Sequence, residues 1–460
     1  MPEAFTVLIM AAGMGTRMKS ALPKVLHPVC GKPMVEWVID AARAAGAEHV
    51  VCVTRPGDGV AEGLPDWVTV AEQREGEGTG AAVLAARAEI EAGAAPVVVL
   101  SGDHPLLSSE VVAGVVERYR RDGAAASMLT TRALDPAGYG RIVRAPDGDV
   151  ARIVETKDTH GVTPEELAIR EVNLGSYAFE PRALIEALDG VGEEKGERYL
   201  TGVFPLLRAR GLRVVTHETA DTSAAQGVNS RVQLMEVEAI ARHRLIERHA
   251  LAGVTFVAPE TVVIDADVEL GADTTIAQGV TLLGATRVGE ACEIGPQATL
   301  IDTVVGAGAP VRHTYHTRAE RPARATLGPF AYLRPGAVVG PGAKVGTFVE
   351  VKNSNIGDGA KVPHLSYIGD TDVGPGANLG ASTITANYDG RRKHRTRIGE
   401  GVKTGIHTSL VAPLDVGDRA YTGAGSVITD DLPDGSLGVA RSRQKTVEGY
   451  ADRAEEESRR

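Results

Sequence analysis

A branched aliphatic residue returns at every sixth position in the second half of the chain. The first unbroken series consists of Ile264, Leu270, Ile276, Leu282, Val288, Ile294 and Leu300. The period resumes at Leu327 and continues, with slips, to Ile428. Hexads are the repeat of a parallel β-helix, in which each coil buries its apolar face only against its neighbours. The pattern therefore predicts a β-helix over residues 253–460, ending in a charged tail that begins at Glu448.

The hexad period fails between residues 306 and 324. His313 and His316 lie in this stretch, but they lack further partners at the spacing of metal ligands. We therefore expect a solvated insertion there, without regular coils and without a metal.

The first half of the chain alternates between apolar runs and helical patterns. Strands are predicted at residues 7–12, 49–53 and 96–100, and helices at residues 35–45 and 81–91. This alternation predicts an α/β domain over residues 1–230, with a Rossmann-like, mostly parallel sheet.

A charged segment with a partial apolar stripe follows, which predicts a linker helix over residues 231–252. The stripe consists of Val232, Met235, Ile240, Leu245 and Ile246. We expect His243 and His249 of this helix to lie on the surface.

Two of the predicted strands end in residues that suit phosphate chemistry. The first runs into Gly13-Met14-Gly15-Thr16-Arg17, and the third runs into Ser101-Gly102-Asp103. Ligands of open α/β sheets bind at the carboxyl ends of strands. The glycine loop lacks the third glycine of a dinucleotide fingerprint, so by itself it indicates only a strand-to-helix turn. Asp103 could hold a divalent cation against phosphates or cap a helix near Pro105, and its position alone does not decide between them.

Composition limits the function classes. The formal net charge of −11 argues against general binding to nucleic acid and to anionic membranes. No apolar stretch is long enough to span a bilayer, and residues 7–12 are too few for a signal peptide. The three cysteines, Cys30, Cys52 and Cys292, are far apart and lack metal spacing, which predicts a reducing cytoplasm.

Several motifs together resemble a known family. They are Ala11-Ala12-Gly13-Met14-Gly15-Thr16-Arg17, Leu22-Pro23-Lys24, Gly102-Asp103, Gly138-Tyr139-Gly140-Arg141 and Gly227-Val228-Asn229-Ser230-Arg231. Their order is similar to that of the sugar-1-phosphate nucleotidyltransferases. With hexads behind them, the chain resembles the bifunctional enzymes that join an N-acetylglucosamine-1-phosphate uridyltransferase to a glucosamine-1-phosphate acetyltransferase. The resemblance implies a left-handed β-helix and a homotrimer.

For the first half, the resemblance implies transfer of a uridyl group from UTP. Arg17 and Lys24 would be catalytic, gripping the triphosphate, while Asp103 and Asn229 would hold Mg²⁺. The implied nucleotide and sugar contacts are Met10, Ala11, Ala12, Gly13, Lys24, Gln73, Gly78, Thr79, Gly140, Glu155, Asn173, Thr201 and Asn229. In-line attack of a sugar phosphate on the α-phosphorus needs positioning and cancellation of charge more than a protein base.

For the second half, the resemblance implies acetyl transfer from acetyl-CoA. His364 would be the general base that takes a proton from the amine of glucosamine-1-phosphate. Arg334 and Lys352, expected on successive coils, would hold the phosphate, and Tyr367 and Asn378 would bind the same substrate. The implied acetyl-CoA contacts are Ala381, Asn387, Tyr388, Ile406, Ala424 and Arg441, and the basic loop at residues 391–397 could meet the phosphates of coenzyme A.

Some positions depart from the family pattern. Val70 replaces a glutamine that reads uracil, and an acidic loop at residues 74–77 follows it. His104 follows the metal aspartate, Gly202 replaces an aspartate, and Ile406 replaces a serine near acetyl-CoA. An alternative function therefore stays open: a nucleotidyltransferase of altered nucleotide or sugar preference, in which the β-helix is mainly a trimerisation scaffold.

Overall fold

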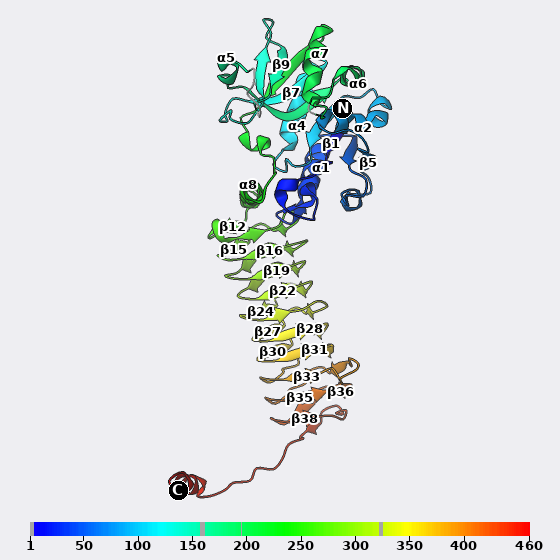
Figure 1. Ribbon diagram of the computed structural model, residues 1–460. Helices are drawn as coiled ribbons and strands as arrows, with labels where there is room; N and C mark the ends of the chain where they lie inside the picture. Colours follow the sequence, from blue (N-terminus) through cyan, green and yellow to red (C-terminus); the bar gives the residue numbers. More distant parts are fainter. Residues whose placement is uncertain (1–3, 157–161, 195, 322–324) are drawn as a thin grey trace. The chain divides into compact units, whose positions relative to one another are not determined.

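The computed structural model describes residues 4–156, 162–194, 196–321 and 325–460 (Figure 1). The chain divides into two compact units, Met1–His243 and Arg244–Arg460. Over the described residues, every helix is too short or too polar to cross a lipid bilayer.

The first unit is built on a mostly parallel sheet. Its strands lie in the order β11 (Val214–Glu218), β7 (Ala126–Thr131), β10 (Val172–Phe179), β6 (Val97–Ser101), β1 (Thr6–Met10), β4 (His49–Thr54) and β5 (Thr69–Glu72). β10 is antiparallel to β6 and β7, whereas β1 is parallel to β4 and β6. The register pairs Met10 with Val53 and with Ser101. The carboxyl ends of three neighbouring strands therefore meet at one edge.

Helices cover both faces of this sheet because its strands alternate between two apolar cores. Val7 and Ile9 of β1 belong to a core with α1 (Met34–Ala44) and α4 (Ser109–Arg121). Leu8 belongs to the opposite core, with α2 (Thr79–Ala85), α6 (Pro181–Gly190) and α7 (Val203–Ala209). The helix predicted over residues 81–91 is two helices, because the chain leaves helical geometry at Ala86 before α3 (Arg87–Glu91).

Smaller elements complete this unit. They are β2 (Pro28–Val29), β3 (Lys32–Pro33), α5 (Pro164–Leu167) and the antiparallel pair β8 (Arg141–Arg144) and β9 (Val150–Val154). The helix α8 (Arg231–Leu251) contains the division between the two units.

Two predictions for α8 are wrong. His249 is buried, and burial lowers the pKa of its imidazole, whereas His243 is exposed as predicted. Val232 and Met235 were assigned to the apolar stripe but are exposed. The buried apolar positions of the helix are Leu234, Val237, Ala241, Leu245 and Ile246.

The second unit is a parallel β-helix whose short strands stack coil upon coil in three faces (Figure 1). The first face holds β12 (Thr255–Phe256), β15 (Thr275–Ile276), β18 (Glu293–Ile294), β21 (Pro310–Val311), β24 (Thr326–Leu327), β27 (Lys344–Thr347) and β30 (Lys361–His364). The second holds β13 (Val263–Ile264), β16 (Thr281–Leu283), β19 (Thr299–Ile301), β22 (Tyr315–Thr317), β25 (Tyr332–Leu333), β28 (Glu350–Lys352), β31 (Tyr367–Gly369), β33 (Ile384–Ala386), β35 (Ser409–Val411) and β38 (Val427–Ile428). The third holds β14 (Glu269–Leu270), β17 (Arg287–Val288), β20 (Val304–Val305), β23 (Glu320–Arg321), β26 (Val338–Val339), β29 (Asn355–Ile356), β32 (Thr371–Val373), β34 (Thr396–Ile398) and β36 (Leu414–Val416). The strands β37 (Tyr421–Thr422) and β39 (Leu437–Gly438) pair with each other, and the exposed helix α9 (Tyr450–Ser458) follows.

The hexad aliphatics point into the β-helix and stack on one another. Leu333, Val351 and Ile368 pair in register on successive coils, and all three are fully buried. Each coil thus supplies one layer of the apolar interior.

The coils also continue through the segment that was expected to be irregular, so that prediction is wrong up to residue 321; residues 322–324 lie outside the described part. His316 of β22 takes the inward position that pairs with Leu300 and is fully buried, 3.0 Å from the hydroxyl of Thr314. Sixteen residues separate His316 from Leu300, whereas eighteen separate Leu300 from Leu282. The shortened coil shifts the hexad phase without interrupting the stack.

Candidate functional site

A cavity of about 250 Å³ opens at the carboxyl ends of β1, β4 and β6. It is lined by Met10, Ala12, Gly13, Met14, Lys24, Val25, Arg55, Gln73, Glu77, Gly78, Thr79, Ala82, Ser101 and Asp103. Most of the predicted nucleotide contacts are therefore gathered here. Ala11 is buried behind the lining, and Arg17 is exposed in the turn Thr16–Met18 without lining the cavity.

Lys24 joins the two predicted metal ligands. Its Nζ lies 2.5 Å from Asp103 Oδ2 and donates a hydrogen bond of 3.1 Å to Asn229 Oδ1. Burial raises the pKa of the Asp103 carboxyl, but the charges of His104 and Lys24 and the hydrogen bond from Lys24 bring it below its ordinary value. The carboxylate is thus charged at neutral pH, and it faces a cation.

Asp103 does not cap a helix. The next helix, α4, begins at Ser109, and its N-cap is Ser108, whose hydroxyl accepts a hydrogen bond from the backbone of Val111. Of the two interpretations left open by the sequence, this geometry favours the cation site.

Arg55 and Glu77 line the cavity, although the sequence did not single them out as site residues. Arg55 Nε donates to Ala12 O at 2.6 Å, and Nη2 contacts Glu77 Oε2 at 2.7 Å. Arg55 follows β4 directly, so the rule that ligands bind at strand ends could have identified it. Val70, which was expected near the base, is exposed on β5 and is not part of the lining.

Three of the predicted sugar contacts lie together: Gly140 directly before β8, Glu155 directly after β9, and Asn173 on β10. The carbonyl of Gly140 accepts a hydrogen bond from the backbone of Asn173. A Cβ on Gly140 would lie 3.7 Å from both carboxylate oxygens of Glu155. The side chain of Asn173 is held by Tyr177, whose hydroxyl accepts from Nδ2 at 2.7 Å. These contacts fix the polar groups of the three residues in one place.

Thr201 lies on the turn Leu200–Gly202, which is hydrogen-bonded to a residue that lines the cavity at the ends of β1, β4 and β6. The backbone of Leu200 donates to the hydroxyl of Thr79 at 2.9 Å. A Cβ at Gly202 would lie 2.8 Å from Val191 Cγ1, so the close packing of Val191 explains why a larger residue is absent there.

In the second unit, the register places Arg334 one coil before Lys352, as predicted, because Leu333 pairs with Val351. Arg334 Nη1 donates to Glu350 Oε1 at 2.9 Å, and Lys352 Nζ lies 3.5 Å from Asp370 Oδ2. Each cation is thus paired with a carboxylate of the following coil.

A loop brings further polar groups to Lys352. Ile384 pairs with Ser409 on the next coil, and twenty-five residues separate the two positions. The additional residues of this long coil form the basic loop. Lys393 of this loop lies close enough to Lys352 for the two ammonium groups to interact, and this interaction lowers the pKa of Lys393. Asn387 Nδ2 contacts Asp370 Oδ2 at 2.5 Å and lies 3.5 Å from the hydroxyl of Tyr367. The residues predicted for sugar phosphate and cofactor therefore meet here, together with Lys393, which the sequence placed only in a basic loop.

His364 begins a column of predicted site residues along one corner of the β-helix. Lys361, Asn378, Lys403 and Tyr421 pair in series, which aligns the residues three positions later. Those residues are His364, Ala381, Ile406 and Ala424. The backbone amides of the residues that follow Ala381, Ile406 and Ala424 donate to the carbonyls of His364, Ala381 and Ile406, respectively.

The remaining predicted contacts of this unit lie outside the corner column. Asn378 is exposed on the first face, and Tyr388 is exposed in the basic loop. Arg441 is exposed beyond β39.

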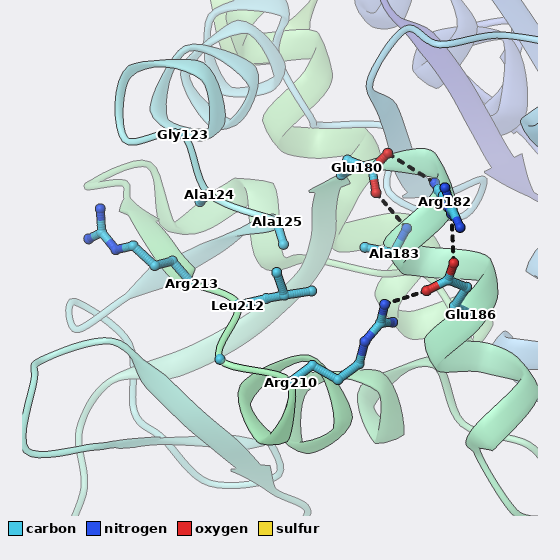
Figure 2. Close-up of a pocket in the computed structure, with 11 residues that line it drawn as sticks. Gly123, Ala124, Ala125, Glu180, Arg182, Ala183, Glu186, Arg210, Leu212 and Arg213 are labelled. Atoms are coloured by element: carbon cyan, nitrogen blue, oxygen red, sulfur yellow. Dashed lines mark hydrogen bonds and ion pairs between the residues drawn. The ribbon is translucent and has the colours of Figure 1, made fainter.

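A larger cavity of about 510 Å³ lies beside α6 (Figure 2). Glu186 there contacts both Arg182 and Arg210, and Glu180 accepts from the backbone at the start of the helix (Figure 2). Because these charges are satisfied by one another, the cavity offers no comparable constellation for catalysis.

Comparison with known proteins found matches to both units. A MobA-like NTP transferase domain matches residues 7–202. A bifunctional protein GlmU of Streptomyces avermitilis is 47% identical over 97% of this chain and 94% of its own length. Proteins of the same name from a Geobacillus species and from Kineococcus radiotolerans are 42% and 47% identical, over 97% and 96% of this chain and 97% and 91% of their own lengths.

Proposed function

The chain belongs to the family of bifunctional GlmU proteins, and from this membership we propose that its two units catalyse two consecutive reactions. The second unit acetylates glucosamine-1-phosphate with acetyl-CoA. The first unit couples the resulting N-acetylglucosamine-1-phosphate to UTP and gives UDP-N-acetylglucosamine and pyrophosphate. The fold class is an α/β nucleotidyltransferase unit followed by a left-handed β-helix, as predicted. The alternative of a scaffold β-helix is not favoured, because the relatives match both units.

The contact of Lys24 with Asp103 and Asn229 carries the proposal for uridyl transfer. UTP brings a triphosphate, so the site must offer positive charge beside the glycine loop. Nucleotidyl transfer uses a divalent metal, and we propose Mg²⁺, which carboxylate and amide oxygens suit. Asp103 and Asn229 would hold the ion, which would neutralise phosphate charge. Lys24 would then bind phosphate oxygens, and we propose the same role for Arg17, which is exposed at the glycine loop.

Acetyl transfer is assigned to the corner column and the cations beside it. Arg334, Lys352 and Lys393 bind the phosphate of glucosamine-1-phosphate. The amine nitrogen attacks the thioester carbonyl of acetyl-CoA, the C–S bond breaks, and coenzyme A leaves as the thiolate. His364 is exposed on the column and accepts the proton that the amine loses. UTP and acetyl-CoA are intracellular co-substrates, so we place the protein in the cytoplasm.

We propose that a homotrimer forms along an apolar stripe made of Phe330, Phe348 and Leu365. Their exposed fractions are 54%, 59% and 56%. The rings of Phe330 and Phe348 stack with centroids 5.4 Å apart. A continuous exposed stripe of this kind is typical of a protein–protein interface. Because Leu365 follows His364, a neighbouring chain on the stripe would also cover the acetyl site.

Replacing Phe348 with aspartate is expected to convert the trimer into monomers, because an interface of this stripe would bury an unpaired charge. Sedimentation velocity measures the change in mass. The rate of acetyl transfer should fall when the trimer dissociates, whereas uridyl transfer should persist. Val257→Asp changes an equally exposed residue outside the stripe and should leave the trimer intact. A trimeric Phe348→Asp protein would contradict this interface.

The proposed function is tested by incubating the full chain with acetyl-CoA, glucosamine-1-phosphate, UTP and Mg²⁺, with the products followed by mass spectrometry. We expect UDP-N-acetylglucosamine to accumulate only when all three substrates are present. Replacing UTP in turn by ATP, GTP, CTP and dTTP tests the base preference. A stronger yield with another triphosphate would exclude UTP as the preferred substrate.

A further inference from the structure

The imidazole of His104 lies beside the Asp103 carboxylate. Its Nε2 is 4.0 Å from Asp103 Oδ1, and both side chains are only 16% exposed. Within the described part of the chain, the buried Nδ1 atom has no hydrogen-bond partner. The ring is thus a largely buried polar group: Nδ1 has no partner among the described residues, and Nε2 faces the Asp103 carboxylate.

The backbone around the ring fixes its place. A Cβ on Gly227 would lie 2.4 Å from His104 Nε2, so only glycine leaves room for the ring at this point. The backbone of Val228 donates to the carbonyl of Asp103 at 3.0 Å. Gly227 and Val228 lead directly into Asn229, so one set of contacts sets the imidazole, the carboxylate and the amide beside one another.

We propose that His104 is a further ligand of the divalent cation held by Asp103 and Asn229. This inference rests on the proposed nucleotidyl transfer, which requires the cation. Bonds from a metal to nitrogen and to oxygen are each about 2.1 Å long, so one ion can reach two atoms up to about 4.2 Å apart. The 4.0 Å between Nε2 and Oδ1 falls within that reach. Lys24 Nζ contacts both the Asp103 carboxylate and the Asn229 amide oxygen, so these two groups already attract a positive charge.

An imidazole ligand changes which ions the site prefers. Mg²⁺ favours oxygen ligands, whereas imidazole favours transition metals, whose affinity rises from Mn²⁺ through Co²⁺. The ratio of Mn²⁺ affinity to Mg²⁺ affinity is therefore higher at this site than at a site with only the two oxygen ligands.

The test uses the intact protein, in excess over Mn²⁺ and UTP, with bound Mn²⁺ examined by pulsed electron paramagnetic resonance. A directly bound imidazole gives a modulation from its ¹⁴N nucleus, and we expect it in the wild type. His104→Val should remove the modulation and weaken Mn²⁺ binding by about tenfold or more, since even outer-shell partners contribute that much. Mg²⁺ affinity, measured by displacement of Mn²⁺, should change less. His49→Val, at an exposed position of the same unit, should change nothing.

The possible failures are distinguishable. Bound Mn²⁺ without nitrogen modulation in the wild type would overturn the role of His104 and leave the proposed function intact. A folded His104→Val protein that kept the modulation would do the same. If the wild type bound no Mn²⁺ even with UTP, both this inference and the proposed metal site would be wrong. His104→Asn, which keeps a polar side chain, replaces the valine variant if the latter does not fold.

Discussion

Uridyl transfer is expected to fall by about a thousandfold or more in an Asp103→Ala protein, while acetyl transfer stays at the wild-type rate. Asp103 is the carboxylate that faces the cationic group of Lys24 at the mouth of the glycine loop. Its removal takes away the charge that would hold the divalent ion, and groups that stabilise transition-state charge contribute about this much to phosphoryl transfer. Acetyl transfer should persist because its residues lie in the second unit. Pyrophosphate release and acetyl-CoA consumption are measured on the same preparation.

Asp66→Ala provides the matched control, since Asp66 is an exposed aspartate of the same unit and does not line the cavity. It should retain both activities. If the Asp103→Ala protein were folded but had lost acetyl transfer as well, the two reactions would not belong to separate units.

Acetyl transfer is expected to fall by about a hundredfold to ten-thousandfold in a His364→Ala protein, with uridyl transfer unchanged. General base catalysis contributes rate factors of this size. His364 is exposed at the top of the corner column, and its backbone carbonyl, not its side chain, holds the next coil. The substitution should therefore remove the base without disturbing the stack. The rate is followed by release of the coenzyme A thiol.

A pH profile separates catalysis from packing. The pH dependence of acetyl transfer should differ between the wild type and His364→Ala, because only the wild type carries the proposed general base. His243→Ala, at an exposed position on α8, should behave like the wild type. Unchanged acetyl transfer in the His364→Ala protein would remove His364 from the mechanism and favour a different base.

The architecture of the second unit was predictable because one inward residue per hexad is a strong physical requirement. Leu333, Val351 and Ile368 satisfy it in perfect register. The prediction failed at His316, where the inward residue is polar and the coil is two residues short. A prediction based on the spacing of aliphatic residues cannot identify a histidine that takes an inward, normally aliphatic position beside a threonine hydroxyl.

The candidate sites were predictable where a local motif carries the chemistry. Lys24, Asp103 and Asn229 come from three distant motifs, and the sheet brings them within contact of one another. Lys393 was predicted only as part of a basic loop that could meet the phosphates of coenzyme A, because its contact with Lys352 depends on how the long coil folds back. A contact between a loop and a neighbouring coil produces no periodicity and no characteristic spacing in the sequence.

The corner column also has a dynamic consequence. Opening a coil at the end of a stack breaks contacts with one neighbour, whereas opening an interior coil breaks contacts with two. Amide hydrogen exchange should therefore be faster toward the last coils than in the middle of the stack. The column begins with His364 in an interior coil and ends with Ala424, close to the final strands β38 and β39. The proposed proton acceptor therefore lies in the part of the β-helix expected to exchange slowly, and the far end of the proposed cofactor site lies where the backbone is expected to open most readily.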